Sequence, residues 1–291
     1  MSTVDMNTGA APTGGAGPRR RGSVVPPVSG CVLLTLVLFA LFAPFLAPHP
    51  ANAPIGVPYA MPGDVGVLGT DYLGRDLLSR ILAGGRSLVL VAAACTFTAG
   101  LLGTALGLMA GYRRGLVDAV IMRVVDLLLI LPPLVVLLVL TSGAERGPRM
   151  LIPVIMISAS PYVARVVRTA TLDVARSSYV EAAVLRGEKA RAILVREILP
   201  NVAGPVLAIT GLLMIYAIFV VASASFLGVG IQPPAADWSL MIKEGMPAIT
   251  LNAWPVIFPA ACIVVLAVAV NIFAEGLHRR IAGGRAGRRG A

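Results

Sequence analysis

Charged residues are scarce in this chain. Only 13% of its 291 residues are Asp, Glu, Lys or Arg, about half the roughly 25% typical of soluble domains, whereas 57% are hydrophobic. So little charge excludes an ordinary soluble enzyme and a disordered protein. Lys and Arg outnumber Asp and Glu by 24 to 14, but on so apolar a chain membrane topology explains the excess better than nucleic acid does. The composition indicates an integral membrane protein without a nucleic-acid partner.

Residues that carry chemistry are scarce as well. The three cysteines, Cys31, Cys95 and Cys262, lie in apolar runs, so they predict neither a disulfide nor a metal framework. The two histidines lie outside these runs, and the sequence contains no GxxxxGK[ST] phosphate loop. We therefore expect no catalytic residue, no metal and no cofactor on this chain. Any ATP and Mg would have to be bound by a partner.

Six apolar segments approach the length of about 20 residues that a bilayer-spanning helix needs. They cover residues 31–47, 87–111, 119–140, 150–167, 202–226 and 253–273. Helices satisfy their own backbone polar groups in lipid, and no barrel-like alternation is present. The predicted fold class is therefore all-α, a polytopic membrane protein with six transmembrane helices. Residues 1–29 are expected to form a disordered tail, 30–48 the first helix, 49–86 an external loop, 87–277 a core of five helices, and 278–291 a basic tail.

The distribution of basic residues sets the orientation. If the N-terminus is cytoplasmic, most Lys and Arg fall on the cytoplasmic face, and both termini lie inside. Three arginines, Arg19 to Arg21, precede the first apolar run and could belong to a cleaved signal peptide. That run is long for a signal peptide and five further spans follow it, so a retained helix is favoured. We expect a multi-pass membrane protein.

The longest cytoplasmic loop, residues 163–201, has the pattern of two short helices joined by a glycine turn. Ser178 and Glu181 have the spacing of a capping box, and good helix formers follow. Gly187 suits the left-handed residue that ends a helix, and a second helix is expected from Lys189 to Pro200. Such a short helical protrusion could dock into a partner's groove or rest on lipid headgroups, and composition alone does not decide between the two.

This loop resembles the EAA motif of ABC-importer permease subunits. The matching sequence is EAA at 181–183, followed by a glycine and by EILP at 197–200. In that family the motif forms a coupling helix that docks into the cytoplasmic ATPase. The resemblance thus implies an ATPase-coupling role for Glu181, Ala182, Ala183, Gly187, Leu199 and Pro200. Glu197 is a departure, since the peptide branch of the family often has His there.

Two external patterns resemble the dipeptide/oligopeptide/nickel group of these permeases, specifically its C-type subunit. The first, GTDxxGRDxxSR, contains Gly69, Asp71, Gly74, Arg75, Asp76 and Arg80. Asp76 and Arg80 have i,i+4 spacing for an ion pair, and structural bracing is favoured over substrate contact. The second, SFLGxGxQPP, is expected to turn the chain at an external gate through Phe226, Gly228, Gly230, Gln232, Pro233 and Pro234. Trp238 beyond it is interpreted as an interfacial anchor.

Small residues and prolines mark the spans themselves. Gly103, Gly107 and Gly111 repeat the GxxxG spacing that lets helices pack closely, either within the chain or against a partner permease. Asp126 is expected near the cytoplasmic end of its span, in an interfacial ion pair with Arg123. The pair Pro132–Pro133 predicts a kink in the third span.

The resemblance implies an ATP-driven importer of a bacterial plasma (inner) membrane, most simply of di- or oligopeptides, working by alternating access. Its expected partners are a B-type permease in a heterodimer, two ATPase domains, an extracytoplasmic substrate-binding protein and the bilayer. The alternative is an ion-gradient-driven secondary transporter, which would carry an internal repeat and buried ionisable groups. A scaffold with a signalling loop is also open, but it would leave the external motifs without a purpose.

Overall fold

The computed structural model describes residues 35, 37–143 and 147–288, and side-chain surroundings as far as Gly276. Its helices are α2 (Leu77–Arg113), α3 (Gly115–Ile130), α4 (Pro133–Thr141), α5 (Pro148–Val174), α6 (Ser178–Leu185), α7 (Ala190–Ala192), α8 (Leu199–Leu227), α9 (Trp238–Gly245) and α10 (Trp254–Arg288). Short 3-10 turns are η1 (Ala43–Leu46) and η3 (Met246–Ala248), and η2 (Ile193–Ile198) is a π-helical segment. The all-α class is confirmed.

Within these residues, four helices are long and apolar enough to cross a membrane: α2, α5, the continuous stretch Ala190–Leu227, and α10 as far as Gly276. The pair α3 and α4 counts as a fifth if it is one span broken by an 88° bend. In the first predicted span, residues 31–34 and 36 lie outside the described residues, and the described part contains the shorter apolar helix Val37–Leu46. The tail 1–29 also lies outside the described residues, as do the side chains of the basic tail 278–291.

The bend between α3 and α4 falls at the predicted proline pair. Leu131 and Pro132 are extended, with ψ of 123° and 130°, and Pro133 begins α4. Proline lacks the amide hydrogen that would continue the helix, and the residue before a proline is driven out of the helical region. The chain therefore leaves α3 abruptly and restarts in a new direction.

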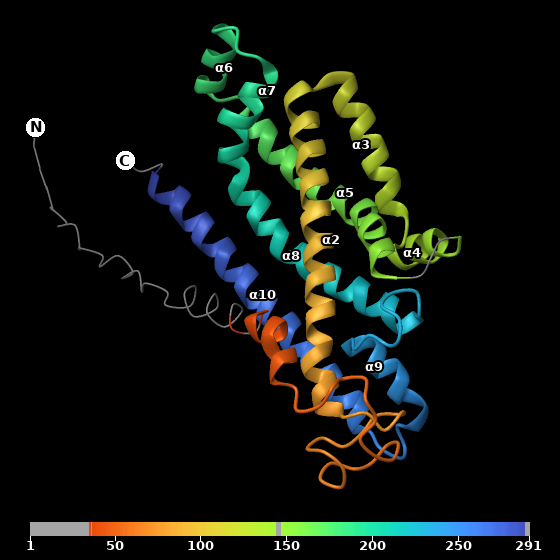
Figure 1. Cartoon of the computed structure of the whole chain (residues 1–291). Coiled ribbons are helices and arrows are strands. Elements are labelled where there is room, and N and C mark those ends of the chain that lie inside the picture. Colours follow the sequence, from red (N-terminus) through yellow and green to blue (C-terminus); the bar gives the residue numbers. More distant parts are fainter. Residues whose placement is uncertain (1–34, 36, 144–146, 289–291) are drawn as a thin grey trace, which may run out of the picture.

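The glycine repeat of α2 packs against α5 of the same chain. A Cβ atom on Gly103 would lie 2.6 Å from the carbonyl oxygen of Ser160, and one on Gly107 would lie 2.7 Å from that of Ala164. A Cβ atom on Gly111 would lie 2.9 Å from the carbonyl oxygen of Arg168. Of the two predicted roles for this repeat, close packing within the chain is the one observed. Figure 1 shows α2 crossing α5 along this contact.

The prediction that a helix ends at Pro200 is wrong. Helix α7 passes through the π segment η2 into α8 without interruption. A proline ring inside an α-helix collides with the carbonyl of the residue four positions earlier. The wider π turn just before Pro200 relieves this clash, and the Asn201 side chain donates to the carbonyl oxygen of Glu197 at 2.7 Å. The loop is therefore shorter than predicted, because α5 also continues to Val174.

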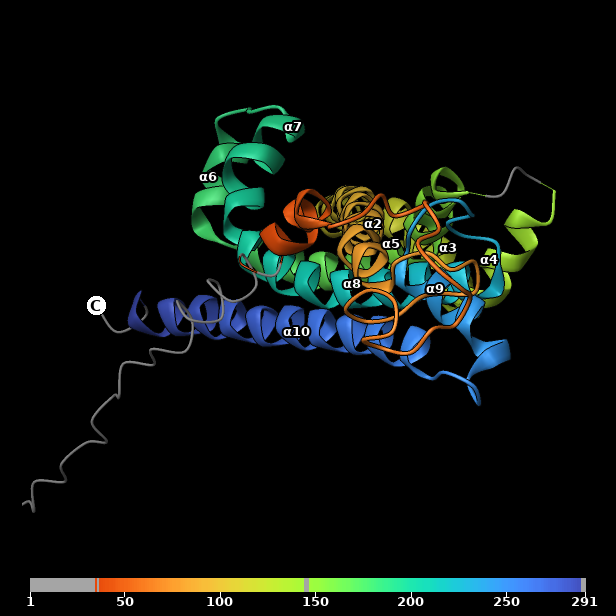
Figure 2. The same cartoon turned by 60° about the horizontal axis from the view of Figure 1, so that its bottom comes forward.

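The bundle carries its distinctive segments at opposite ends. Figure 1 shows α6 and α7 at one end, and α9 with the loop before α2 at the other. Both views place α10 alongside α8, and Figure 2 shows it running past the bundle as one long helix. A core of buried apolar residues joins α2, α5 and α8 between the two ends. The sequence motifs thus fall at the two ends that this core holds apart.

Candidate functional sites at the two ends of the bundle

The EAA residues form the short helix α6. Its N-cap is Ser177, with no side-chain cap hydrogen bond, so the predicted capping box of Ser178 and Glu181 is wrong. The Ser177 hydroxyl instead donates to the carbonyl oxygen of Val174 at 2.6 Å. The C-terminal end is as predicted, since Gly187 has a φ of +73° and the amide of Glu188 donates to the carbonyl oxygen of Ala183 at 3.2 Å.

One face of α6 is held by the bundle and the other is free. Val180 and Ala183 are buried in a small apolar cluster completed by Ile193, Ile198 and Val202. On the outer side Glu181 and Pro200 are exposed, and Ala182 and Leu199 are half-buried. Leu185 is 88% exposed at the helix end. An apolar tip on a rigidly seated helix is suited to insertion into a groove.

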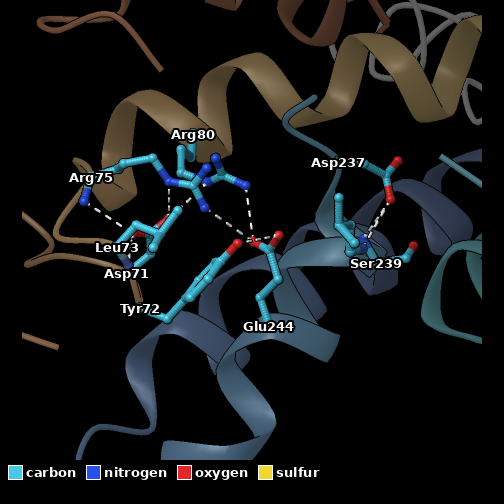
Figure 3. Close-up of polar contacts among 9 residues, drawn as sticks. Asp71, Tyr72, Leu73, Arg75, Arg80, Asp237, Ser239 and Glu244 are labelled. Carbon is cyan, nitrogen blue, oxygen red and sulfur yellow. Dashed lines mark hydrogen bonds and ion pairs between the residues drawn. The ribbon is translucent and has the colours of Figure 1, made fainter. Parts of the chain in front are cut away.

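At the opposite end, four charged side chains form a buried cluster, which we call the external cluster (Figure 3). It consists of Asp71, Arg75, Arg80 and Glu244. Asp71 Oδ2 lies 2.7 Å from Arg75 Nε and 3.2 Å from Arg80 Nε. Glu244 Oε2 lies 3.1 Å from Arg80 Nη2 and 3.4 Å from Arg75 Nη2. Arg80 is fully buried, so its charge is balanced by these carboxylates rather than by water.

The predicted ion pair between Asp76 and Arg80 is wrong. Asp76 is the N-cap of α2, where its side chain accepts hydrogen bonds from the backbone amide and the hydroxyl of Ser79. His49 Nδ1 also lies 3.4 Å from Asp76 Oδ2. A carboxylate engaged at a helix start cannot reach one turn ahead as well, and Arg80 turns instead toward Asp71 and Glu244.

The glycines of the external motif permit close backbone contact. Gly69 and Gly74 have φ of +81° and +72°. A Cβ atom on either would collide with a carbonyl oxygen, that of Ala60 for Gly69 and that of Gly56 for Gly74. The loop thereby folds tightly enough to present Asp71 to the arginines.

Glu244 was missed from the sequence, although it lies on α9 and joins that helix to the loop before α2. Burial raises the pKa of Glu244, and Arg80 and Arg75 pull it back down. Tyr72 adds a hydrogen bond from its hydroxyl at 3.2 Å. One feature of the sequence could have pointed to Glu244: it is the only carboxylate between Asp237 and Glu275.

The SFLGxGxQPP segment ends α8 and turns back on itself. The motif ends the helix, as predicted, and Gly228, with a φ of +82°, is its C-cap. The Ser225 hydroxyl oxygen accepts from the amide of Ile231 at 3.1 Å, and Gln232 Nε2 donates to the carbonyl oxygens of Gly228 and Gly230 at 3.0 and 3.1 Å. The turn closes with a cis bond between Pro233 and Pro234. Phe226 is 42% exposed and lines an open apolar pocket between α8, α9 and α10.

Trp238 is a packing residue and not an interfacial anchor. It is 6% exposed, and its Nε1 donates to the carbonyl oxygen of Ile81 at 2.7 Å. Gly84 and Gly85 make room for the ring, since a Cβ atom on either would lie within 3 Å of it. Two small residues facing an indole explain why it lies inside the protein.

Asp237 caps α9 from a fully buried position. Its Oδ1 accepts from the amides of Ser239 and Leu240 at 3.0 and 3.1 Å, while Oδ2 has no hydrogen-bond partner (Figure 3). Burial raises the pKa of Asp237 to about 6, and the two amides hold it from rising further.

Two ion pairs join α3 to α5, and neither was predicted from the sequence. Arg168 pairs with Asp118 through both ends of its guanidinium group, and Arg165 pairs with Asp126. The expected pair of Asp126 with Arg123 is therefore wrong. The reason is that α3 begins at Gly115, so Asp126 lies three turns inside the helix and faces α5.

Comparisons with known proteins agree with this architecture. Residues 103–283 match the family described as binding-protein-dependent transport system inner membrane component. The chain is 32% identical over 261 residues to the probable D,D-dipeptide transport system permease protein DdpC of Escherichia coli K12, covering 89% of this chain and 87% of that protein. It is 30% identical over 268 residues to the oligopeptide transport system permease protein OppC of Bacillus subtilis 168, covering 89% and 86%.

A solved structure shares the fold. The structure of the MetNI methionine ABC transporter in inward-facing conformations superimposes with a TM-score of 0.58 at 16% identity, covering 69% of this chain and 96% of that chain. The helical bundle, the family match and the two relatives lead to one conclusion: this chain belongs to the family of binding-protein-dependent transport system inner membrane components, the multi-pass permease subunits of bacterial ABC importers.

Proposed function

We propose that this chain forms one half of the membrane pathway of an ATP-driven importer of di- or oligopeptides. The relatives named for D,D-dipeptide and oligopeptide transport support this cargo class, because they align over nearly the whole chain. The observation that carries the proposal is α6, a helix whose inner face is fixed by the bundle while Leu185 at its end is 88% exposed.

The proposed partners follow from the family and from the two ends of the bundle. A B-type permease would complete a heterodimer, and two ATPase domains would bind ATP and Mg. Their contact would be the α6 end, through Glu181, Ala182, Ala183, Gly187, Leu199 and Pro200. Both chain termini would then be cytoplasmic. An extracytoplasmic binding protein would deliver peptide at the α9 end.

The two external motifs would have different roles. The external cluster ties α9 to the start of α2, so the GTDxxGRD residues would brace this end rather than contact cargo. The SFLGxGxQPP turn lies between α8 and α9, where a change in the angle between the helices would open or close the external side. Alternating access then requires only that ATP binding and peptide binding favour different bundle states.

An ion-gradient-driven transporter is the rival function. Such a protein would carry its coupling ion on ionisable groups near mid-membrane. The carboxylates of α3 are instead paired with arginines of α5, Asp118 with Arg168 and Asp126 with Arg165. A lone coupling ion such as Na⁺ or H⁺ on either carboxylate would leave its arginine without a counter-charge, so these pairs are poor coupling-ion sites.

Uptake by the purified complex separates these functions. The permease pair and its ATPases would be reconstituted in liposomes with the binding protein outside and a labelled dipeptide as cargo. We expect uptake with ATP inside and no ion gradient, and none with a proton or sodium gradient alone. Gradient-driven uptake without ATP would refute the proposal.

A further inference from the structure

An ion pair within the membrane-spanning part of the bundle is open to its surroundings. Arg165 of α5 and Asp126 of α3 are 56% and 52% exposed, although they pair directly. The neighbouring pair of Arg168 and Asp118 is more enclosed, at 31% and 16%. Two pairs of the same chemistry on the same two helices thus differ in how far they are covered.

The open pair lies two to three turns inside two helices of the membrane-spanning bundle. Arg165 is nine residues before the end of α5 at Val174, and Asp126 is eleven residues after the start of α3 at Gly115. At about 1.5 Å per residue these positions lie roughly 14 and 16 Å from the same end of the bundle. With these helix ends placed in the headgroup layer, both positions fall inside a hydrocarbon core of about 30 Å.

Lipid is a poor neighbour for this surface. Charged side chains inside a membrane face protein or a water-filled cavity, because hydrocarbon cannot solvate them. The pair also lies within a longer polar face of α5, in which Tyr162, Thr169 and Asp173 are exposed together with Arg165. We call these four residues the α5 stripe. The opposite face of α5 is the one packed on the glycines of α2.

We propose that the α5 stripe lines the water-filled passage of the importer, and that Arg165 and Asp126 form a transient site for the charged ends of a zwitterionic peptide. This inference rests on the proposed function and names the part of the chain that its cargo would touch. The guanidinium group of Arg165 would take the peptide carboxylate. Asp126 would take the peptide ammonium group.

The pairing explains why such a site would let its cargo leave. When the peptide binds, Arg165 exchanges the Asp126 carboxylate for the peptide carboxylate, and Asp126 gains the peptide ammonium group. One ion pair thus becomes two. The resident pair reforms when the peptide departs. A passage needs sites that bind well enough to admit the cargo and weakly enough to release it.

Water access is tested by thiol labelling in the assembled, transporting complex. In a chain whose three cysteines are replaced by alanine, Tyr162→Cys is compared with Val124→Cys, using a permanently charged methanethiosulfonate reagent. The two native side chains are 48% and 52% exposed and lie roughly 18 and 14 Å from the same end of the bundle, but Val124 is on an apolar face of α3. We expect Tyr162→Cys to react about tenfold faster, because only a thiol in water forms the reactive thiolate. Equal labelling rates for the two variants would overturn the proposal. If both rates were slow, lipid or the partner permease would cover the α5 stripe.

Peptide contact is tested by the double variant Arg165→Gln, Asp126→Asn, which keeps a hydrogen-bonding pair without charge. We expect the maximal rate of ATP-driven dipeptide uptake to fall about tenfold, the size of one charge-assisted hydrogen bond. The half-saturating concentration of loaded binding protein should stay the same. An unchanged maximal rate in an assembled complex would overturn the peptide site. If the variant does not assemble, the labelling comparison decides, since both of its variants keep the pair. Wild-type uptake is measured first, so a failure of the proposed function is seen separately.

Discussion

Replacing Gly107 of α2 by alanine adds a methyl group where α2 and α5 are in close contact. The added group should push the two helices apart. A Cβ atom on Gly107 would lie 2.7 Å from the carbonyl oxygen of Ala164 and 2.7 Å from Val167 Cβ. Ordinary contacts begin near 3.4 Å, so α5 would have to move by about 0.7 Å, and the obstacle is backbone, which cannot rotate away. Overpacking of this kind costs about 1–3 kcal/mol.

Gly100 provides the matched control on the same helix. Its nearest neighbour would be Leu213 Cδ2 at 3.9 Å, so alanine fits there without displacement. Both substitutions gain the same helix propensity, about 1 kcal/mol, and the comparison cancels it. Gly107→Ala should therefore be less stable than Gly100→Ala by about 1–3 kcal/mol, or several degrees in Tm at about 2–4 °C per kcal/mol. Thermal unfolding of the two purified variants in detergent measures this. A Gly107→Ala protein as stable as Gly100→Ala would refute the packing argument.

Two further predictions concern the external end. The pKa of Asp237 is about 6 in the folded protein against 3.8 ordinarily, so the folded state binds this proton more tightly than the unfolded state. The contribution of Asp237 to stability is therefore greatest below pH 3.8 and is lost as the pH rises through 6. This decline amounts to about 3 kcal/mol, and Asp237→Asn should abolish it. Melting curves from pH 4 to 8 measure this, and a variant whose stability still declined with pH would contradict the prediction. Glu244→Gln should destabilise the protein by about 3 kcal/mol, because it leaves the buried Arg80 with one carboxylate fewer. Asp64→Asn, on an exposed part of the same loop, should change the melting temperature little, and equal shifts for the two variants would contradict the role of the external cluster.

Much of the fold was predictable because long apolar runs leave a membrane chain little choice. The spans at 87–111, 150–167 and 202–226 lie within observed helices, and the span at 253–273 lies within α10 except for its first residue. The kink at Pro132 and the left-handed Gly187 were predictable for the same kind of reason, since each depends on the backbone chemistry of one residue type.

Contacts between distant segments could not be predicted in this way. The partner of Arg80 was expected one turn away, but Asp76 was already engaged as a helix cap and Glu244 approached from 164 residues further along the chain. Trp238 was expected at the membrane surface because nothing local revealed that Gly84 and Gly85 would form its pocket. Asp126 was misplaced because the start of α3 was set four residues too late, which hid its approach to Arg165.

The central claim, that this permease is coupled to ATP hydrolysis through α6, is tested most directly at Gly187. Its φ of +73° is closed to proline, while the space around it is open, with no atom within 4 Å of a Cβ, so the backbone alone is perturbed. Asparagine tolerates the left-handed conformation and provides the control. We would measure ATP hydrolysis by the reconstituted complex with and without peptide-loaded binding protein. The account predicts that Gly187→Asn keeps the stimulation and Gly187→Pro loses it while the complex still assembles. Full stimulation in an assembled Gly187→Pro complex would contradict it.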